Sequence, residues 1–208
     1  MPRHTSRIAA AVIALVGIIS LGLQLHFTLI DAQANGMSAA AAVWRYLGYF
    51  TILTNFLVLG TMTKIALGKP VSASFAACIT LNILIVGVIY HVLLASQWDP
   101  QGWGKVADQG LHTVVPLLTL LLWLFALPKA ELKLEDVPKW LIWPMGYGGY
   151  AIVRAMFDGF YPYPFIDAGV LGAARVALNM VGLALAFAVS GLAMVLIGRR
   201  LSLVRATG

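Results

Sequence analysis

The sequence has few charged residues and a single cysteine. Of its 208 residues, 11% are charged and 61% are hydrophobic, whereas a soluble domain carries roughly a quarter charged residues. This composition is typical of a membrane protein with several spans. The net charge of +6 then concerns orientation across a bilayer rather than nucleic acid, because no solvated basic domain is present. The lone Cys78 excludes an intrachain disulfide and a cysteine-rich metal site.

The sequence also lacks a glycine-rich phosphate loop, a Gly-x-Ser-x-Gly motif and a long polar linker, so we expect no cofactor. It has instead six apolar segments, each close to the 20 or so residues of a spanning helix. The segments are residues 8–30, 44–67, 73–95, 110–127, 137–157 and 171–197. Because only helices and closed barrels span lipid, we predict one all-α membrane domain over residues 1–208, with six transmembrane helices.

The first segment also resembles a signal peptide. Arg3 and Arg7 precede its apolar run, and residues 32–34 (AQA) follow it. The run is longer than the usual 7–15 residues of a signal peptide, and it carries Gln24 and His26. We therefore expect a retained helix.

Lysine and arginine gather in the connections on one side of the predicted helices. Ten lie on that side: Arg3, Arg7, Lys64, Lys69, Lys129, Lys133, Lys139, Arg199, Arg200 and Arg205. The opposite connections hold only Arg45 and Lys105, with Arg154 and Arg175 inside helix ends. Because positive charge favours the cytoplasmic side, we predict cytoplasmic N- and C-termini and a location in the plasma (inner) membrane.

With this orientation, all six predicted helices carry their polar residues in their outer halves. These are Gln24, His26, Thr28, Thr51, Thr54, Asn55, Tyr90, His91, His112, Arg154, Asp158, Arg175 and Asn179, with Asn82 nearer mid-depth. A charge at the bilayer centre costs at least roughly 2.5–3.5 kcal/mol, so polar groups at one depth favour a shared cavity that opens to the outer leaflet. The alternative is snorkelling of single side chains to the interface.

Two of these residues have the chemistry of a nucleophile and its base. Thr51 shares a helix face with Asn55, and its hydroxyl needs a base such as His112 to become reactive. Pro116 lacks an N–H, so the carbonyl of His112 loses its helical partner, which lipid tolerates only beside a polar cavity. The alternatives are a Thr51 hydroxyl bonded to the carbonyl four residues earlier and a purely structural His112.

Other residues near the predicted outer surface have plainer interpretations. Arg154 and Asp158 are four residues apart and favour an ion pair. Arg175 and Asn179 are candidates for orienting a carboxylate or an ester oxygen. Residues 161–165 (YPYPF) cannot form regular helix, because each proline restricts the residue before it. We expect a rigid outer loop there, either an aromatic anchor or a lid.

Two further functions remain open at this point. His26, His91 and His112 are candidate ligands of a catalytic zinc, although no His-x-x-x-His pair occurs. Alternatively, the cavity belongs to a small transporter or a lipid-binding protein that holds an anionic ligand near Arg154 and Arg175.

Four motifs in the sequence carry a resemblance to a known family. They are residues 44–55 (WRYLGYFTILTN), Tyr90-His91 with residues 98–100 (WDP), residues 111–116 (LHTVVP) and residues 161–167 (YPYPFID). In these the chain resembles the androgen-inducible membrane proteins, and most of all their bacterial six-span relatives. The animal members are intramembrane hydrolases of fatty acid esters of hydroxy fatty acids, with a threonine nucleophile and a histidine.

The resemblance implies that Thr51 is the nucleophile and His112 the base of a fatty-acyl ester hydrolase, with a membrane lipid as substrate. Two spacings differ. The animal asparagine follows the threonine by three residues, whereas Asn55 follows Thr51 by four, and Thr54 holds the third position. The separation of Thr51 and His112 is also shorter than in the animal proteins. The residues that we expect to line the substrate cavity are Thr54, Asn55, Asn82, Tyr90, His91, Arg154, Asp158, Tyr161, Tyr163, Asp167, Arg175 and Asn179.

Overall fold

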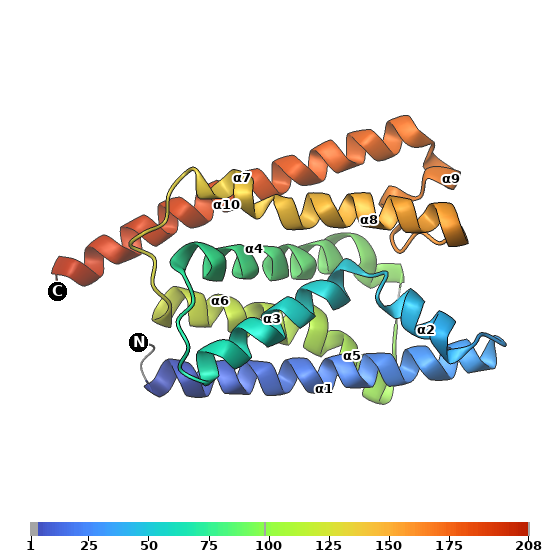
Figure 1. Ribbon diagram of the computed structural model, residues 1–208, viewed down its shortest axis with the longest axis horizontal. Helices are drawn as coiled ribbons and strands as arrows, with labels where there is room; N and C mark the ends of the chain where they lie inside the picture. The colour runs from blue at the N-terminus through green and yellow to red at the C-terminus, as the bar shows by residue number, and fades with distance from the viewer. Residues whose placement is uncertain (1–3, 98, 208) are drawn as a thin grey trace.

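The structure is a computed structural model that describes residues 4–97 and 99–207, so Arg3 and Trp98 lie outside the described residues. The described part is helical and contains no strand. Its long helices lie roughly along one axis (Figure 1). We call the end where α1 begins and α10 finishes the terminal end, and the opposite end the distal end.

The helices follow one another in up-and-down order along this axis (Figure 1). In chain order they are α1 (His4–Ala34), α2 (Ala39–Tyr46), α3 (Phe50–Ala66), α4 (Ala73–Ile89), the π-helix η1 (Tyr90–Leu94), the 3-10 helix η2 (Ala95–Gln97), α5 (Gly102–Gln109), the π-helix η3 (Gly110–Val114), α6 (Val115–Ala126), α7 (Asp136–Trp140), α8 (Ile142–Asp158), the 3-10 helix η4 (Pro164–Ile166), α9 (Ala168–Leu171) and α10 (Ala173–Thr207).

Four of the helical stretches are long and apolar enough to cross a membrane, and a fifth is added if α2 and α3 form one bent span. The four are His4–Ala34, Ala73–Gln97, Gly102–Ala126 and Ala173–Leu203. The chain is therefore an all-α membrane protein, as the composition indicates. With 17 residues, α8 is shorter than the roughly 20 residues of a full span. A sixth span and the sides of the termini stay predictions.

The second apolar segment, expected as one helix over residues 44–67, is instead bent by 77° between α2 and α3. Gly48 lies in the bend, where an added Cβ would come within 2.9 Å of the carbonyl oxygen of Arg45. The next residue is extended, and α3 starts at Phe50. Thr51 consequently lies in the first turn of its helix, where backbone N–H groups have no helical partner, and not about 10 Å along it.

The fourth segment starts earlier than expected, at Gly102 rather than residue 110, and it changes pitch before Pro116. Because Pro116 has no N–H to give to the carbonyl of His112, the chain widens into the π-helical turn η3. That carbonyl packs against α4, where a Cβ on Gly87 would lie 2.9 Å from the His112 oxygen. The kink expected from Pro116 is thus a π-helical turn.

The core holds α3, α4, α6 and α7 together. Its largest fully buried side chains include Met62 of α3, Ile83 of α4, Trp123 of α6 and Trp140 of α7. The N–H of Trp140 donates to the hydroxyl of Ser74 over 3.0 Å, which ties α7 to the start of α4. This core fixes the helices whose ends carry the candidate site.

Candidate functional site

Thr51 is buried, with 8% of its surface exposed, and its hydroxyl lies beside a tyrosine from a distant loop. Its N–H donates to the hydroxyl oxygen of Tyr163 over 3.3 Å, and its Oγ1 lies 3.5 Å from the same hydroxyl. Thr61 and Thr80 differ, because their hydroxyls donate to the carbonyls four residues earlier over 2.7 and 2.8 Å. Thr51 has no such bond among the described residues. The bend before α3 therefore leaves its hydroxyl in a different environment.

Asn55 joins the start of α3 to η3. Its Nδ2 donates to the carbonyl of Thr51 over 2.9 Å and lies 3.4 Å from the carbonyl of Leu111, the residue before His112. The side chain is 1% exposed, and its Oδ1 has no hydrogen-bond partner among the described residues. One buried amide thus connects the backbones on which Thr51 and His112 are carried.

His112 is oriented by a buried carboxylate on its own helix. Its Nδ1 lies 3.1 Å from Oδ1 of Asp108 and 3.0 Å from the Asp108 carbonyl oxygen. Because both oxygens only accept, Nδ1 must be the donor, and in the neutral ring Nε2 is then the free base. Within residues 4–97 and 99–207, Nε2 of His112 makes no hydrogen bond. This leaves one ring nitrogen available for a proton transfer.

Tyr90 completes the arrangement around Asp108. Its hydroxyl donates to Oδ2 of Asp108 over 2.6 Å, so both carboxylate oxygens are engaged, and Asp108 is only 3% exposed. The Tyr90 ring also stacks on the His112 ring, with centroids 3.9 Å apart and planes within 12°. The histidine is held from its edge by Asp108 and from its face by Tyr90.

These residues lie on two facing π-helical turns, η1 with Tyr90 and His91 and η3 with His112 and Thr113. Nε2 of His91 lies 3.0 Å from Oγ1 of Thr113, whose hydroxyl donates to Oε1 of Gln109 over 2.9 Å. Single π-helical turns inside α-helices occur frequently at functional sites. Here they bring His91 of η1 against Thr113 of η3, and Tyr90 of η1 against His112 of η3.

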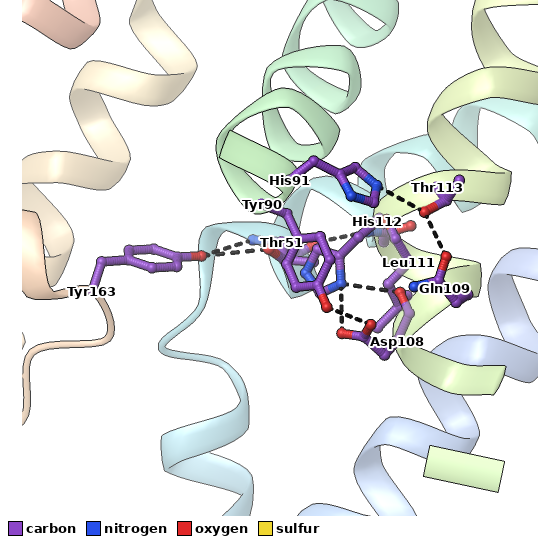
Figure 2. A network of polar contacts seen from close by, with 10 residues as sticks. Thr51, Tyr90, His91, Asp108, Gln109, Leu111, His112, Thr113 and Tyr163 are labelled. Carbon is purple, nitrogen blue, oxygen red and sulfur yellow. Dashed lines mark hydrogen bonds and ion pairs between the residues drawn. The ribbon is translucent and has the colours of Figure 1, made fainter. Parts of the chain in front are cut away.

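Thr51, Tyr90 and Tyr163 line one small cavity of about 60 Å³, whose remaining lining is mostly apolar side chains of α4, α8 and α10. Figure 2 shows Tyr163 reaching Thr51 from one side, with Tyr90, His112 and Asp108 on the other. No hydrogen bond joins Thr51 to His112 in the described part of the chain. The two are linked through the Asn55 amide and through the Tyr90 ring, which contacts His112 and lines the Thr51 cavity.

Three residues that were expected to line the cavity make contacts elsewhere in the structure. Oγ1 of Thr54 accepts from the indole N–H of Trp143 over 3.1 Å. Asn82 is fully buried, and its Nδ2 donates to the carbonyl of Cys78 over 2.9 Å. Arg175 is exposed on α10. The structure does not bring these side chains to Thr51.

Arg154 and Asp158 form the expected ion pair, with Nη2 and Oδ2 3.9 Å apart. The guanidinium of Arg154, 5% exposed, also donates to the carbonyl of Trp44 and, over 2.9 Å, to the hydroxyl of Tyr150. It lies 3.9 Å from the centroid of the Trp44 indole ring, and the indole N–H donates to Asp158 over 2.6 Å. This cluster fastens α8 to α2, and none of its four side chains is among the described residues that line the Thr51 cavity.

The loop around residues 161–165 is fixed to α10 and α9. Asn179 donates to the carbonyl of Phe165 over 2.8 Å, and Asp167 caps α9 by accepting from the N–H groups of Gly169 and Val170. Tyr161 is half-buried in this loop. Of the loop side chains expected at the site, Tyr163 is the one that the structure brings to Thr51.

Asp108 is the residue that the sequence reasoning missed. It stands four residues before His112, the spacing at which side chains meet on a helix, and this spacing would have revealed it. The apolar segment predicted from the sequence starts at residue 110, which leaves Asp108 in a loop. For the zinc alternative, no group of three His, Cys, Asp or Glu side chains among the described residues is arranged to hold a metal ion.

No family model, no curated protein and no solved structure matches this chain. A histidine that is oriented by a carboxylate and has a free Nε2 can act as a general base, and a buried threonine hydroxyl near an apolar cavity is a candidate nucleophile.

Proposed function

We propose that this protein is an intramembrane lipid-ester hydrolase of the kind that the family resemblance implies. Thr51 would be the nucleophile, His112 the general base and Asp108 the group that orients His112. The observation that carries the proposal is the contact of the buried Asp108 carboxylate with Nδ1 of the partly buried His112. This pair is linked to Thr51 through the Asn55 amide. Carboxylate, histidine and hydroxyl are the three parts of a hydrolytic triad.

The reaction would proceed in two acyl-transfer steps. Thr51 turns about its Cα–Cβ bond toward His112, and Nε2 takes the hydroxyl proton as Oγ1 attacks the ester carbonyl carbon. The carbon–oxygen bond to the alcohol breaks, and the alcohol leaves with the proton from Nε2. Water then gives a proton to Nε2 and attacks the acyl-threonine, which releases the fatty acid and returns the proton to Thr51. Asp108 keeps the proton on Nδ1 throughout.

Tyr163 would stabilise the negative charge on the substrate oxygen. Its hydroxyl lies 3.5 Å from Oγ1 of Thr51, beside the point at which the oxyanion forms. Burial raises the pKa of this phenol, so the hydroxyl keeps a proton to donate. Donors aimed at the developing charge supply a large share of the catalysis in such sites.

The finer topology belongs to the same proposal. With α7 and α8 as one further crossing, the chain would have six spans. The excess of lysine and arginine in the connections on one side supports N- and C-termini on the cytoplasmic side of the inner membrane. The distal end, with the Thr51 cavity, would then face the outer leaflet. An ester would enter from the lipid, with its polar group at that level.

The test is labelling of purified protein with a fluorophosphonate probe, together with turnover of a fatty-acyl ester. We expect the probe on Thr51, mapped by peptide mass spectrometry. Thr51→Ala and His112→Ala should each lose turnover by on the order of 10⁴-fold or more. Thr61→Ala is the matched control, because that hydroxyl is bonded within its own helix. Labelling and turnover of Thr51→Ala at the level of the unsubstituted protein would show that Thr51 is not the nucleophile.

A second candidate is a lipid-binding protein or small transporter without catalysis. It is favoured by the Thr51 hydroxyl facing Tyr163 rather than a base. This function predicts ligand binding without turnover and indifference to Thr51→Ala, so the same experiment separates the two.

A further inference from the structure

A second hollow, separate from the Thr51 cavity, lies along α8. It is a groove of about 740 Å³ between α8, the first half of α3 and the start of α4. Leu53 of α3, Phe75 of α4 and Trp143 of α8 are among its apolar walls. Its volume is within the range of about 300–1,000 Å³ that holds small-molecule ligands. We call it the α8 groove.

The rim of the α8 groove is apolar and open to the surroundings. Ile142 and Phe75 on its rim are 71% and 47% exposed. In a chain that spans a membrane, such side chains face lipid tails rather than water. A groove with this rim is accessible sideways from the bilayer.

The α8 groove and the Thr51 cavity share one wall, the side chain of Tyr147. Its ring lies 5.0 Å from that of Phe50, the residue before Thr51, and its hydroxyl donates to the carbonyl of Gly48 over 2.8 Å. The cavity of about 60 Å³ has room for about two groups the size of a water molecule. An ester group fits that space, whereas a helix does not.

We propose that the α8 groove binds the hydrocarbon chain of a long-chain acyl ester whose carbonyl group passes Tyr147 to reach Thr51. The inference rests on the proposed hydrolase function and adds the chain subsite. The groove continues from Tyr147 of α8 beyond the start of that helix to Lys139 of α7. Lys139, with its side chain 68% exposed, marks the polar end of this path.

The fit of the chain, rather than its removal from water, sets the expected size of the effect. A hydrocarbon chain that moves from lipid into an apolar groove gains no hydrophobic transfer energy, because lipid is equally apolar. Packing against the groove walls is what remains. Filling the groove should therefore change selectivity for long chains by about tenfold, while a short acyl group, which does not enter it, should be unaffected.

Two glycines of α8 provide a matched test. Gly146 lines the α8 groove and Gly149 does not, both are exposed, and an added Cβ at either would meet nothing within 4 Å. The measurement is kcat/KM for 4-nitrophenyl hexadecanoate relative to 4-nitrophenyl acetate. We expect the ratio to fall about tenfold in Gly146→Leu and to stay within about twofold in Gly149→Leu. Equal ratios in the two variants would overturn the proposal.

A binding measurement separates this inference from the hydrolase function. A hexadecanoyl ester with a diazirine in its chain should cross-link to the walls of the α8 groove in Thr51→Ala, and this cross-link should be lost when Gly146→Leu is added. Cross-links in the α8 groove, together with no ester turnover by the unsubstituted protein, would exclude the hydrolase function and still support the chain-binding site. Cross-links elsewhere overturn the subsite. A dimer that dissociates in Gly146→Leu would assign the groove to a second copy instead.

Discussion

Two pairs of ionisable side chains, each four residues apart on a helix, have opposite arrangements in this molecule. In the Arg154–Asp158 pair, the guanidinium has contacts with Asp158, Trp44 and Tyr150. In the Asp108–His112 pair, both carboxylate oxygens are engaged, but Nε2 of His112 has no partner among the described residues. The first pair fastens helices, and the second keeps one group ready to accept a proton. Spacing alone does not distinguish them.

Among the substitutions that test this contrast, we expect Asp108→Asn to have the largest effect on ester turnover. The amide nitrogen of asparagine can donate to Nδ1 of His112, which moves the ring proton to Nε2 and removes the base. We expect kcat to fall by on the order of 10³–10⁴-fold. The measurement is ester turnover by purified protein, with labelling of Thr51 as a second readout.

Asp99→Asn is the control for this prediction, because Asp99 is an exposed carboxylate outside the site. It should leave turnover within about twofold, as surface changes usually do. Near-normal turnover in Asp108→Asn would show that the Asp108–His112 pair is a structural contact, like the Arg154–Asp158 pair.

Tyr163→Phe should have the next largest effect. The change removes only the hydroxyl that lies beside Oγ1 of Thr51 and keeps the ring stacked on Phe165. Loss of one oxyanion donor costs about 10²–10³-fold in kcat, and KM should change little. Tyr161→Phe in the same loop is the control. A rise in KM with unchanged kcat would instead make Tyr163 a substrate-positioning residue.

Part of the fold and of the site could be predicted from the sequence, because the patterns that indicate it lie within single segments of the chain. The apolar runs predict helices that can span a membrane, and four or five of them are long and apolar enough to do so in the structure. The four-residue spacing indicates the Arg154–Asp158 pair. The outer-level grouping includes Thr51 and His112 among its polar residues, and their side-chain chemistry makes them candidates for a nucleophile and its base. Each of these inferences uses neighbours on one helix or one composition rule.

The remainder depends on contacts between distant segments. The hydroxyl of Tyr163 meets Thr51 across 112 positions of the chain, and no local pattern encodes that approach. The bend at Gly48 depends on space that Arg154 of α8 fills, 3.1 Å from where a Cβ would lie. Hydropathy also left Asp108 outside the predicted span, because a carboxylate in the second turn of the helical stretch Gly102–Ala126 lowers the apolar average that defines a span.

The smallest effect is expected from Arg154→Lys, and it concerns stability rather than turnover. Lysine keeps the positive charge but lacks the planar fork that bonds Trp44 and Tyr150 and stacks on the Trp44 indole. We expect a loss of about 1–2 kcal/mol, or a fall in Tm of roughly 2–8 °C in a thermal unfolding scan, with turnover within about threefold. Arg175→Lys, on an exposed side chain, should leave Tm unchanged. If Arg154→Lys abolished turnover at an unchanged Tm, Arg154 would belong to the catalytic site, and the contrast between a fastening pair and a reactive pair would fail.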